Sequence, residues 1–115
     1  MLEERQHEIH AEKNILNHLR HLTSVNKLYS AFHDSLRLYF LLEFVPNGSL
    51  QDLLARKTVF SLNLTKFIAA EILLALQDLR ANQVLHRDLK PGNIMFDHDY
   101  HIKLIDFATS LTTNP

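Results

Sequence analysis

The spacing of apolar residues predicts three helices. Over residues 3–22, apolar positions recur at intervals of four, four and three, with polar side chains between them, as on a helix that buries one face. Ser49, followed three residues later by Asp52, is typical of a capped helix start, and a short helix is expected as far as about residue 56. A longer helix is predicted over residues 64–80. Its apolar residues extend almost all round, so it needs more neighbours than this chain supplies.

Shorter apolar runs predict strands. Residues 25–32 and 36–44 are expected to pair across a turn, and the second run has apolar residues on both faces, which favours a buried strand. Residues 94–96 and 102–105 predict a tight hairpin. The tail, residues 109–115, is rich in hydroxyl side chains and is expected to be frayed.

Composition excludes several classes of protein. The 115 residues suit one small domain or part of a larger one, and a net charge of −1 gives no sign of a nucleic-acid partner. No apolar run approaches the length of about 18 residues that would indicate a transmembrane segment. The absence of cysteine excludes disulfides and thiolate metal sites, and it favours a reducing, cytoplasmic (intracellular) location.

The residues that indicate a chemistry lie between the long helix and the tail. The string from His86 to Asn93, His-Arg-Asp-Leu-Lys-Pro-Gly-Asn, fills every fixed position of the pattern H-R-D-L-x-x-x-N. Thirteen residues after Asn93, an apolar run ends in Asp106-Phe107-Ala108. A single Asp or Asn in a turn usually bonds only its own backbone. The joint pattern is specific, however, and through it the chain resembles the eukaryotic protein kinase family.

This resemblance implies roles for four polar side chains. Asp88 would orient the attacking hydroxyl and accept its proton. Lys90 matches the Ser/Thr form of the loop and would stand near the transferred phosphate. Asn93 and Asp106 match the two side chains that bind Mg²⁺, which prefers hard oxygen ligands.

The resemblance also implies a site for ATP. Glu12 matches the helix Glu that pairs with a lysine on a preceding strand. Leu42 would be the gatekeeper residue beside the purine, and Met95 would form the floor under its ring. The Glu43 carbonyl and the Val45 amide would bond to the purine edge. Buried between these parts, a hydrophobic stack is expected from Leu16, Leu28, His86 and Phe107.

The expected fold is α+β and protein-kinase-like. A partial N-lobe (residues 1–42), consisting of a helix and strands, would be joined by a hinge (residues 43–48) to a partial, mainly helical C-lobe (residues 49–115) that reaches the start of the activation loop. The order of these parts is similar to that of the AGC group. The Leu-Tyr-Phe strand, the Asn-Gly hinge and Asp-Phe-x-Thr are similar to those of phosphoinositide-dependent protein kinases.

The sequence departs from the family pattern in four places. No glycine-rich G-x-G-x-x-G loop and no lysine strand of the V-A-I-K type precede the first helix, and no A-P-E follows the tail. The fourth departure is Ala108, which replaces the usual glycine of D-F-G. If this position needs a positive φ, the Cβ of alanine costs about 1 kcal/mol and shifts Asp106.

The function implied is that of a Ser/Thr protein kinase, which transfers the γ-phosphate of ATP to protein hydroxyls when the domain is complete. A partner chain or further kinase segments would have to cover the exposed apolar surface. One alternative is a non-catalytic kinase-like module that binds a partner or a nucleotide. Another is a truncated, inactive gene product. A glycine-rich loop and a lysine upstream of residue 1 would favour the enzyme.

Overall fold

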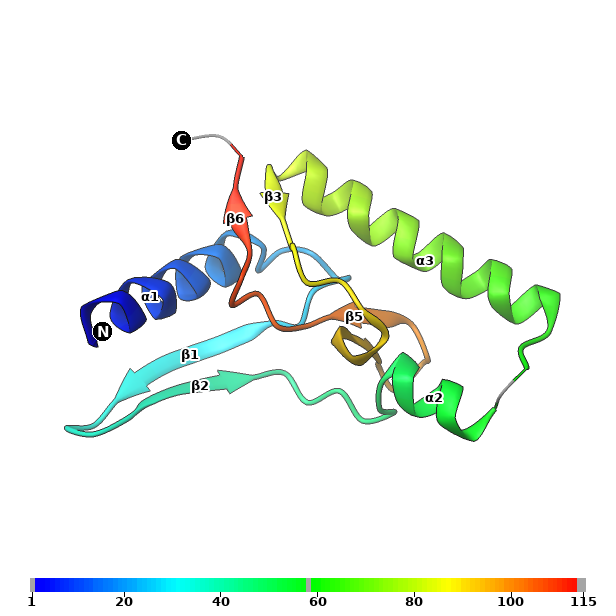
Figure 1. Cartoon of the computed structure of the whole chain (residues 1–115), viewed down its shortest axis with the longest axis horizontal. Coiled ribbons are helices and arrows are strands. Elements are labelled where there is room, and N and C mark those ends of the chain that lie inside the picture. The colour runs from blue at the N-terminus through cyan, green and yellow to red at the C-terminus, as the bar shows by residue number, and fades with distance from the viewer. Residues whose placement is uncertain (1, 58, 114–115) are drawn as a thin grey trace.

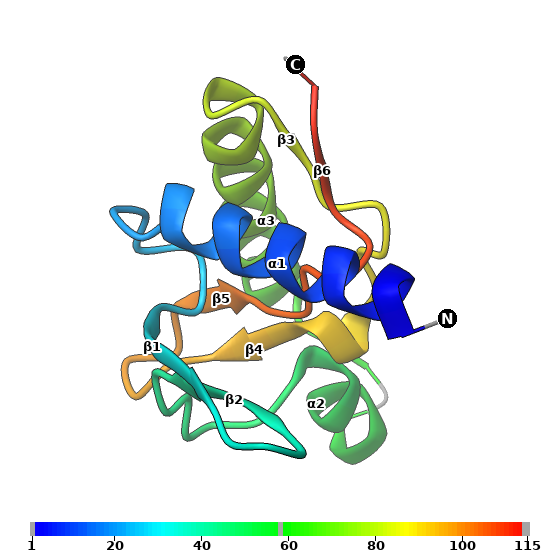
Figure 2. The ribbon, with the colours of Figure 1, turned by 90° about the vertical axis from the view of Figure 1, so that its left-hand side faces the viewer.

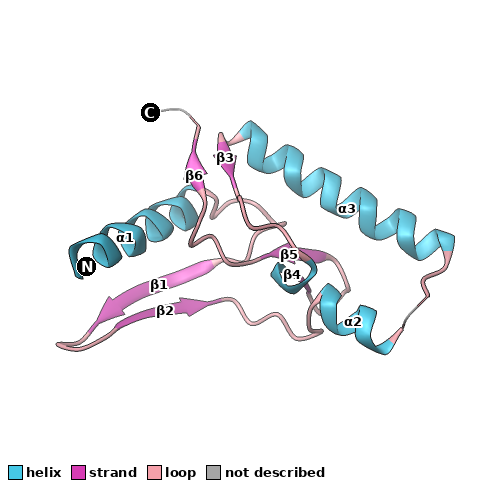
Figure 3. Ribbon diagram, viewed as in Figure 1, coloured by secondary structure: helices cyan, strands magenta, loops and turns pink. Residues whose placement is uncertain are grey.

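The computed structural model describes residues 2–57 and 59–113, and within them it has both helices and small antiparallel sheets (Figures 1 and 3). The elements in chain order are α1 Leu2–His18, β1 Leu28–His33, β2 Leu38–Leu42, α2 Leu50–Arg56, α3 Leu62–Ala81, β3 Val84–Leu85, the 3₁₀ turn η1 Pro91–Asn93, β4 Ile94–Phe96, β5 Ile102–Leu104 and β6 Leu111–Thr112. The predicted α+β class is therefore confirmed.

The molecule is elongated, with principal extents of 48 × 31 × 25 Å. Helix α1 and the β1–β2 pair occupy one end, α2 and α3 the other, and the β4–β5 hairpin lies between them (Figures 1 and 2). Segment 43–48 connects the two ends beside this hairpin.

Helix α1 ends four residues earlier than the apolar spacing predicted. After His18 the chain continues in turns, in which the Leu22 amide donates to the Leu19 carbonyl at 3.0 Å. The buried face of the helix and this turn consists of Ile15, Leu16 and Leu19. The apolar period therefore located the buried face correctly and the helix end incorrectly.

Hydroxyl caps fix the starts of the other two helices. The predicted cap of α2 is confirmed, since the Ser49 hydroxyl accepts from the Asp52 amide at 3.1 Å and the Asp52 carboxylate accepts from the Ser49 amide at 3.0 Å. Helix α3 begins two residues before the predicted start. The reason is Ser61, whose hydroxyl accepts from the Leu64 amide at 3.1 Å and so caps the helix start.

Helix α3 buries only one side. Ile68, Ala75 and Leu79 are buried, whereas Leu73 and Leu74 are each 59% exposed. The prediction that this helix has uncovered apolar surface is confirmed for the part of the chain that the structure describes.

The prediction of a buried second strand is wrong. Strand β2 pairs with β1 alone, and four of its five residues are exposed. Only Phe40 packs against the core. The two apolar faces are real, but within the described residues no third strand or helix covers the outer one.

The first predicted strand is also shorter than expected. Residue 28 opens β1, and the register shifts between Leu28 and Ser30, which leaves Tyr29 as an extra residue in the pair with β2. Val25, expected in the same strand, instead forms an isolated parallel bridge with Leu104 of β5. The first predicted strand thus divides into β1 and a separate contact with the central hairpin.

The predicted hairpin is confirmed as β4 and β5, with Met95 opposite Lys103. The prediction that the tail, residues 109–115, is frayed is wrong for residues 109–113. Strand β6 pairs with β3, and the Thr113 amide donates to the Gln83 carbonyl at 2.8 Å. These backbone bonds order a segment that has little apolar content of its own. Residues 114 and 115 lie outside the described residues.

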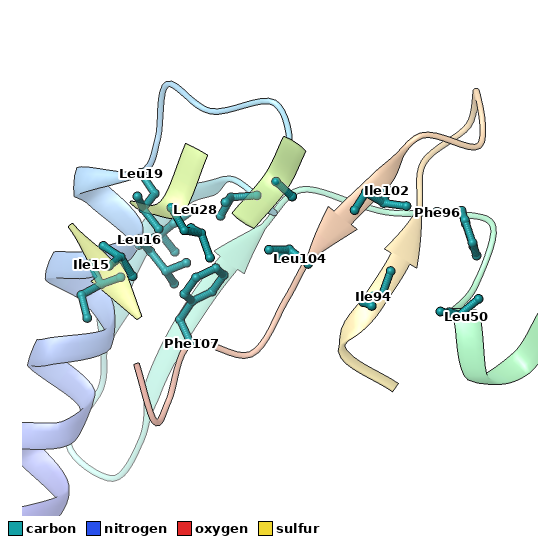
Figure 4. Close-up of a cluster of buried hydrophobic side chains, with 14 of the residues drawn as sticks. Ile15, Leu16, Leu19, Leu28, Leu50, Ile94, Phe96, Ile102, Leu104 and Phe107 are labelled. Atoms are coloured by element: carbon teal, nitrogen blue, oxygen red, sulfur yellow. The ribbon is translucent and has the colours of Figure 1, made fainter. Parts of the chain in front are cut away.

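One buried cluster joins α1, β1 and the central hairpin (Figure 4). Leu16, Leu28 and Phe107 point toward one another in this cluster, as predicted for the hydrophobic stack. The fourth member, His86, is 4% exposed and packs edge-on against Phe107, with ring centroids 4.8 Å apart. The predicted stack is therefore present.

Candidate functional site

A cleft of about 420 Å³ opens between α1, segment 43–48 and the end of the central hairpin. It collects residues that lie far apart in the sequence. Four of them were predicted to contact the purine, Glu12 was predicted to pair with a lysine of the ATP site, and Asp106 was predicted to bind metal. The lining residues are Glu12, Leu16, Asn26, Leu42, Glu43, Phe44, Val45, Met95, Ile105, Asp106 and Phe107.

Backbone bonds attach the far end of segment 43–48 to β4. The Asn47 amide donates to the Phe96 carbonyl at 3.1 Å, and the Phe96 amide donates to the Gly48 carbonyl at 2.9 Å. Ser49 then forms an antiparallel bridge with Met95. Gly48 has φ 72°, a conformation that glycine adopts without a steric cost. Met95 is thereby held in the wall of the cleft.

The loop of residues 86–93 forms a second polar cluster, whose members are not among the residues that line the cleft. The Asn93 side-chain amide donates to the Asp88 carbonyl at 2.9 Å and reaches the Asp88 carboxylate at 3.3 Å. Lys90 Nζ lies 3.7 Å from the same carboxylate. The Asp88 side chain remains 40% exposed, so its carboxylate is fixed in place and still open to a ligand.

His86 ties this loop to the strand that leads into Asp106. Its Nδ1 accepts from the Asp88 amide at 3.1 Å, and its Nε2 lies 2.8 Å from the Ile105 carbonyl. Since Nδ1 is an acceptor, Nε2 carries the hydrogen and donates it to Ile105. A single imidazole therefore fixes the backbone on both sides of the site.

Asn93 and Asp106 are brought together by the hairpin. The Ile105 amide donates to the Asn93 carbonyl at 3.1 Å, one step beyond the β4–β5 pairs. Asn93 is 6% exposed, and its amide nitrogen is used within the loop. Its amide nitrogen lies 3.3 Å from the Asp88 carboxylate, so its amide oxygen is the atom of this side chain that is available to a ligand. Oxygen donors of this kind fit Mg²⁺.

The condition for backbone strain at Ala108, a positive φ, is not met. Ala108 is not among the residues with positive φ, whereas Arg87 has φ 71° and Asp106 has φ 61°. Asp tolerates this region better than most residues, because its short polar side chain bonds locally. Here the Asp106 carboxylate accepts from the Ala108 amide at 3.4 Å. The unusual backbone thus lies at the predicted metal ligand itself.

Glu12 lines the cleft. Burial raises the pKa of its carboxyl group, and the nearby negative charge of Asp106 raises it further. Among the described residues no lysine or arginine forms an ion pair with it. This arrangement is consistent with the lysine partner that the family pattern places on an earlier strand.

Sequence reasoning missed several residues of the site. Asn26 lines the cleft, and its amide oxygen is buried without a hydrogen-bond partner among the described residues. Arg87 bonds through Nε to the Thr109 carbonyl at 2.6 Å, which joins the loop to the chain after Asp106. An Asn before a strand carries no pattern that distinguishes it from a loop residue, and only the parallel bridge at Val25 brings it to the cleft.

Two further observations concern metals and membranes. Among the described residues no group of three or more His, Cys, Asp or Glu side chains is arranged to hold a metal ion. In the same part of the chain, no helix combines the length and the apolar character needed to cross a bilayer.

Comparison of the sequence with known proteins indicates the family to which the chain is similar. The family model described as "Protein kinase domain" matches residues 1–115. The chain is 42% identical to 3-phosphoinositide-dependent protein kinase B of Dictyostelium discoideum over 89% of its own length and 11% of that relative. It is 41% identical to 3-phosphoinositide-dependent protein kinase 1 of Caenorhabditis elegans, over 86% and 16%, and 43% identical to the cAMP-dependent protein kinase catalytic subunit of Dictyostelium discoideum, over 87% and 15%. The chain thus spans between a tenth and a sixth of these relatives.

Proposed function

Because this chain belongs to the protein kinase family, we propose that it supplies the hinge, the catalytic loop and the metal ligands of a Ser/Thr protein kinase of the AGC group. The reaction is transfer of the ATP γ-phosphate to a Ser or Thr hydroxyl of a protein. Because the chain spans a small part of its relatives, the activity belongs to a domain in which a phosphate-binding loop and a lysine are also present.

The observation that carries the proposal is the fixed position of the Asp88 carboxylate. Asn93 bonds to it and to its backbone carbonyl, and Lys90 stands 3.7 Å away. Asp88 is half exposed and can accept the proton of a substrate hydroxyl. The Lys90 ammonium group is placed to balance negative charge beside that carboxylate. These two residues are the proposed catalytic pair.

The cleft is the proposed nucleotide site. Its volume of about 420 Å³ lies within the range of small-ligand sites. The Glu43 carbonyl and the Val45 amide would bond to the purine edge, with Leu42 behind it and Met95 beneath. Glu12 would form an ion pair with the lysine that contacts the ATP phosphates.

Asn93 and Asp106 are the proposed ligands of Mg²⁺, which would neutralise charge on the phosphates. This assignment is supported by the hydrogen bond from the Ile105 amide to the Asn93 carbonyl, which holds residue 93 beside the residue that precedes Asp106. The division into an N-lobe to residue 42, a hinge at residues 43–48 and a C-lobe from residue 49 follows from the same assignment. The intracellular location predicted from the cysteine-free sequence remains part of this proposal, as does the protein, rather than nucleic-acid, substrate.

The test is a chimeric domain in which residues 1–115 replace the matching segment of the Dictyostelium 3-phosphoinositide-dependent protein kinase B. Radiolabelled phosphate transfer to a generic Ser/Thr substrate is measured for the chimera and for Asp88→Asn. We expect the substitution to reduce turnover by about 10²-fold or more, with nucleotide affinity nearly unchanged, because Asp88 addresses the hydroxyl and not the purine.

The matched control is Asp99→Asn, which removes a carboxylate from the exposed turn of the central hairpin. Its turnover should equal that of the chimera. If turnover and nucleotide affinity fall together in Asp88→Asn, or if the chimera transfers no phosphate, the assignment of Asp88 is wrong.

A further inference from the structure

We propose that the Glu43 side chain and the buried Lys103 form a clamp that fixes the hinge, with the Lys27 backbone as its third member. Sequence reasoning used only the backbone carbonyl of Glu43, and it gave Lys103 no role. The three members come from segment 43–48, from β5 and from the loop between α1 and β1. The clamp therefore joins three parts of the chain that meet behind the cleft.

The ion pair at the centre of the clamp is largely withdrawn from solvent. Lys103 Nζ lies 3.1 Å from Glu43 Oε1, with 11% of the Lys103 side chain and 27% of the Glu43 side chain exposed. The other Lys–carboxylate pair among the described residues, Lys90 with Asp88, is longer and more exposed. A charge this buried is retained only with a partner, because removing one partner leaves the other unsolvated.

The same carboxylate holds the loop before β1. Glu43 Oε1 also accepts from the Lys27 amide at 3.3 Å, and the Glu43 amide donates to the Lys27 carbonyl at 2.8 Å. The loop is in turn bonded to β5, since the Asn26 amide donates to the Leu104 carbonyl at 3.0 Å and the Leu104 amide to the Ser24 carbonyl at 2.8 Å. The bonds close a triangle of hinge, loop and β5.

Packing contributes little to this part of the hinge. Phe44, the next residue, is 85% exposed. Glu43 lines the cleft on one side and a second hollow of about 580 Å³ on the other, together with Lys103, Asp78 and His101. With space on both sides, the hinge is held by the polar bonds of the clamp and not by apolar neighbours.

A fixed hinge matters for a nucleotide because lobe closure changes a few backbone torsions at such a segment. The clamp holds residue 43, whose carbonyl faces the cleft, so Glu43 and Lys103 act as positioning residues. This consequence rests on the proposed function, whereas the clamp itself does not.

The first measurement is amide hydrogen exchange of the dilute 115-residue chain without nucleotide. In Lys103→Met, which keeps the length of the side chain and removes its charge, amides of residues 24–27 and 43–45 should exchange about tenfold faster. Amides of residues 68–79 in α3 should be unchanged. Glu43→Gln should give the same pattern. Asp99→Asn, which breaks the exposed pair with His98, is the control and should change neither region.

A double variant, Glu43→Lys with Lys103→Glu, swaps the two charges and restores the ion pair. It provides a test even if the single variants unfold. Recovery of protection at residues 43–45 in this double variant, whether the single variants loosened locally or throughout, supports the clamp. Unchanged exchange in both single variants overturns it, and so does a double variant no better protected than the singles.

Nucleotide affinity of the chimeric domain separates the clamp from the proposed function. Lys103→Met should weaken nucleotide binding by about tenfold, with turnover at saturating ATP changed much less. If exchange reports the clamp but the chimera binds no nucleotide, the proposed function fails and the clamp stands. If nucleotide binds equally well with and without the clamp, the positioning role is overturned.

Discussion

The rings of His86 and Phe107 meet edge to face, with centroids 4.8 Å apart and an interplanar angle of 64°. His86 belongs to the loop that holds Asp88, and Phe107 directly follows Asp106. The contact therefore couples the position of the proposed catalytic carboxylate to that of the proposed metal ligand, in addition to the two backbone bonds that His86 makes.

Phe107→Ala is expected to lower the free energy of unfolding of the chimeric domain by about 3–5 kcal/mol, because Phe107 is 1% exposed and its loss leaves a cavity. Urea denaturation measures the change. Phe44→Ala is the control, since an 85% exposed ring contributes little to the core. Similar losses in the two variants would contradict the buried stack.

Asp106→Ala should weaken Mg²⁺-ATP binding to the chimeric domain far more than binding of metal-free ATP. The reason is that the carboxylate is assigned to the ion and not to the purine or sugar. Calorimetric titration with ATP, in magnesium and in a chelator, makes the comparison. An equal loss under both conditions would show that Asp106 has a structural role instead.

Ala108→Gly should not activate the chimeric domain, because Ala108 is not among the residues with positive φ. Glycine at a position that alanine already tolerates increases the freedom of the unfolded chain, so stability should fall by about 0.4–1 kcal/mol. Thermal unfolding and phosphate transfer together test this. A gain in activity would restore the explanation of strain at this residue.

Sequence patterns located the parts of this chain that depend on local chemistry. The cap at Ser49, the β4–β5 hairpin and the loop of residues 86–93 depend on short-range spacing, and all three are present. The roles of the site residues remain predictions, although the cleft collects those assigned to the nucleotide.

The failures concern contacts made by segments distant in sequence. Burial of β2 depends on a covering element, and order in the tail depends on pairing with β3, neither of which a local pattern reports. The Glu43–Lys103 pair spans 60 residues and needs both the hinge and the hairpin before it can form. Spacing of charges along the chain gives no sign of it.

The His101–Glu71 pair should make stability depend on pH. His101 Nδ1 lies 2.7 Å from Glu71 Oε1, and this hydrogen bond, followed by the charge of Glu71, raises the pKa of His101 above its ordinary 6.5; Asp97 and Asp99 add to the effect. A raised folded-state pKa gives stability that is complete below about pH 6.5 and lost as pH rises through the folded value. Glu71→Gln should therefore lower the urea midpoint of the chimeric domain at pH 6 and leave it unchanged near pH 9. The opposite trend would contradict the pair.

The 115-residue chain alone is expected not to phosphorylate protein. Positioning and electrostatics carry almost all of the rate of phosphoryl transfer. Residues 1–115 contain no glycine-rich loop, and no lysine of the described part pairs with Glu12. Radiolabelled transfer above an Asp88→Asn control would contradict this expectation.

The chain alone is also expected to self-associate through the exposed side of α3. Light scattering should show species larger than the monomer, and Leu73→Gln with Leu62→Gln should reduce them, because both leucines are exposed on this helix. If the unchanged chain were a monodisperse monomer, the expectation that the exposed side of α3 drives self-association would be wrong.

The pairing of β3 with β6, which lie side by side (Figure 1), closes a loop of the chain that contains the proposed catalytic residues. Residues 86–110 make up this loop, which is closed at its base by the strand bonds and by the bond from the Thr113 amide to the Gln83 carbonyl. The entropy of closing a loop rises only slowly with its length. Inserted residues in the exposed turn at His98 and Asp99 should therefore cost little, and the two halves of the site should remain joined. The activation loop that would follow residue 113 in a complete kinase would then begin from a fixed anchor beside the catalytic loop.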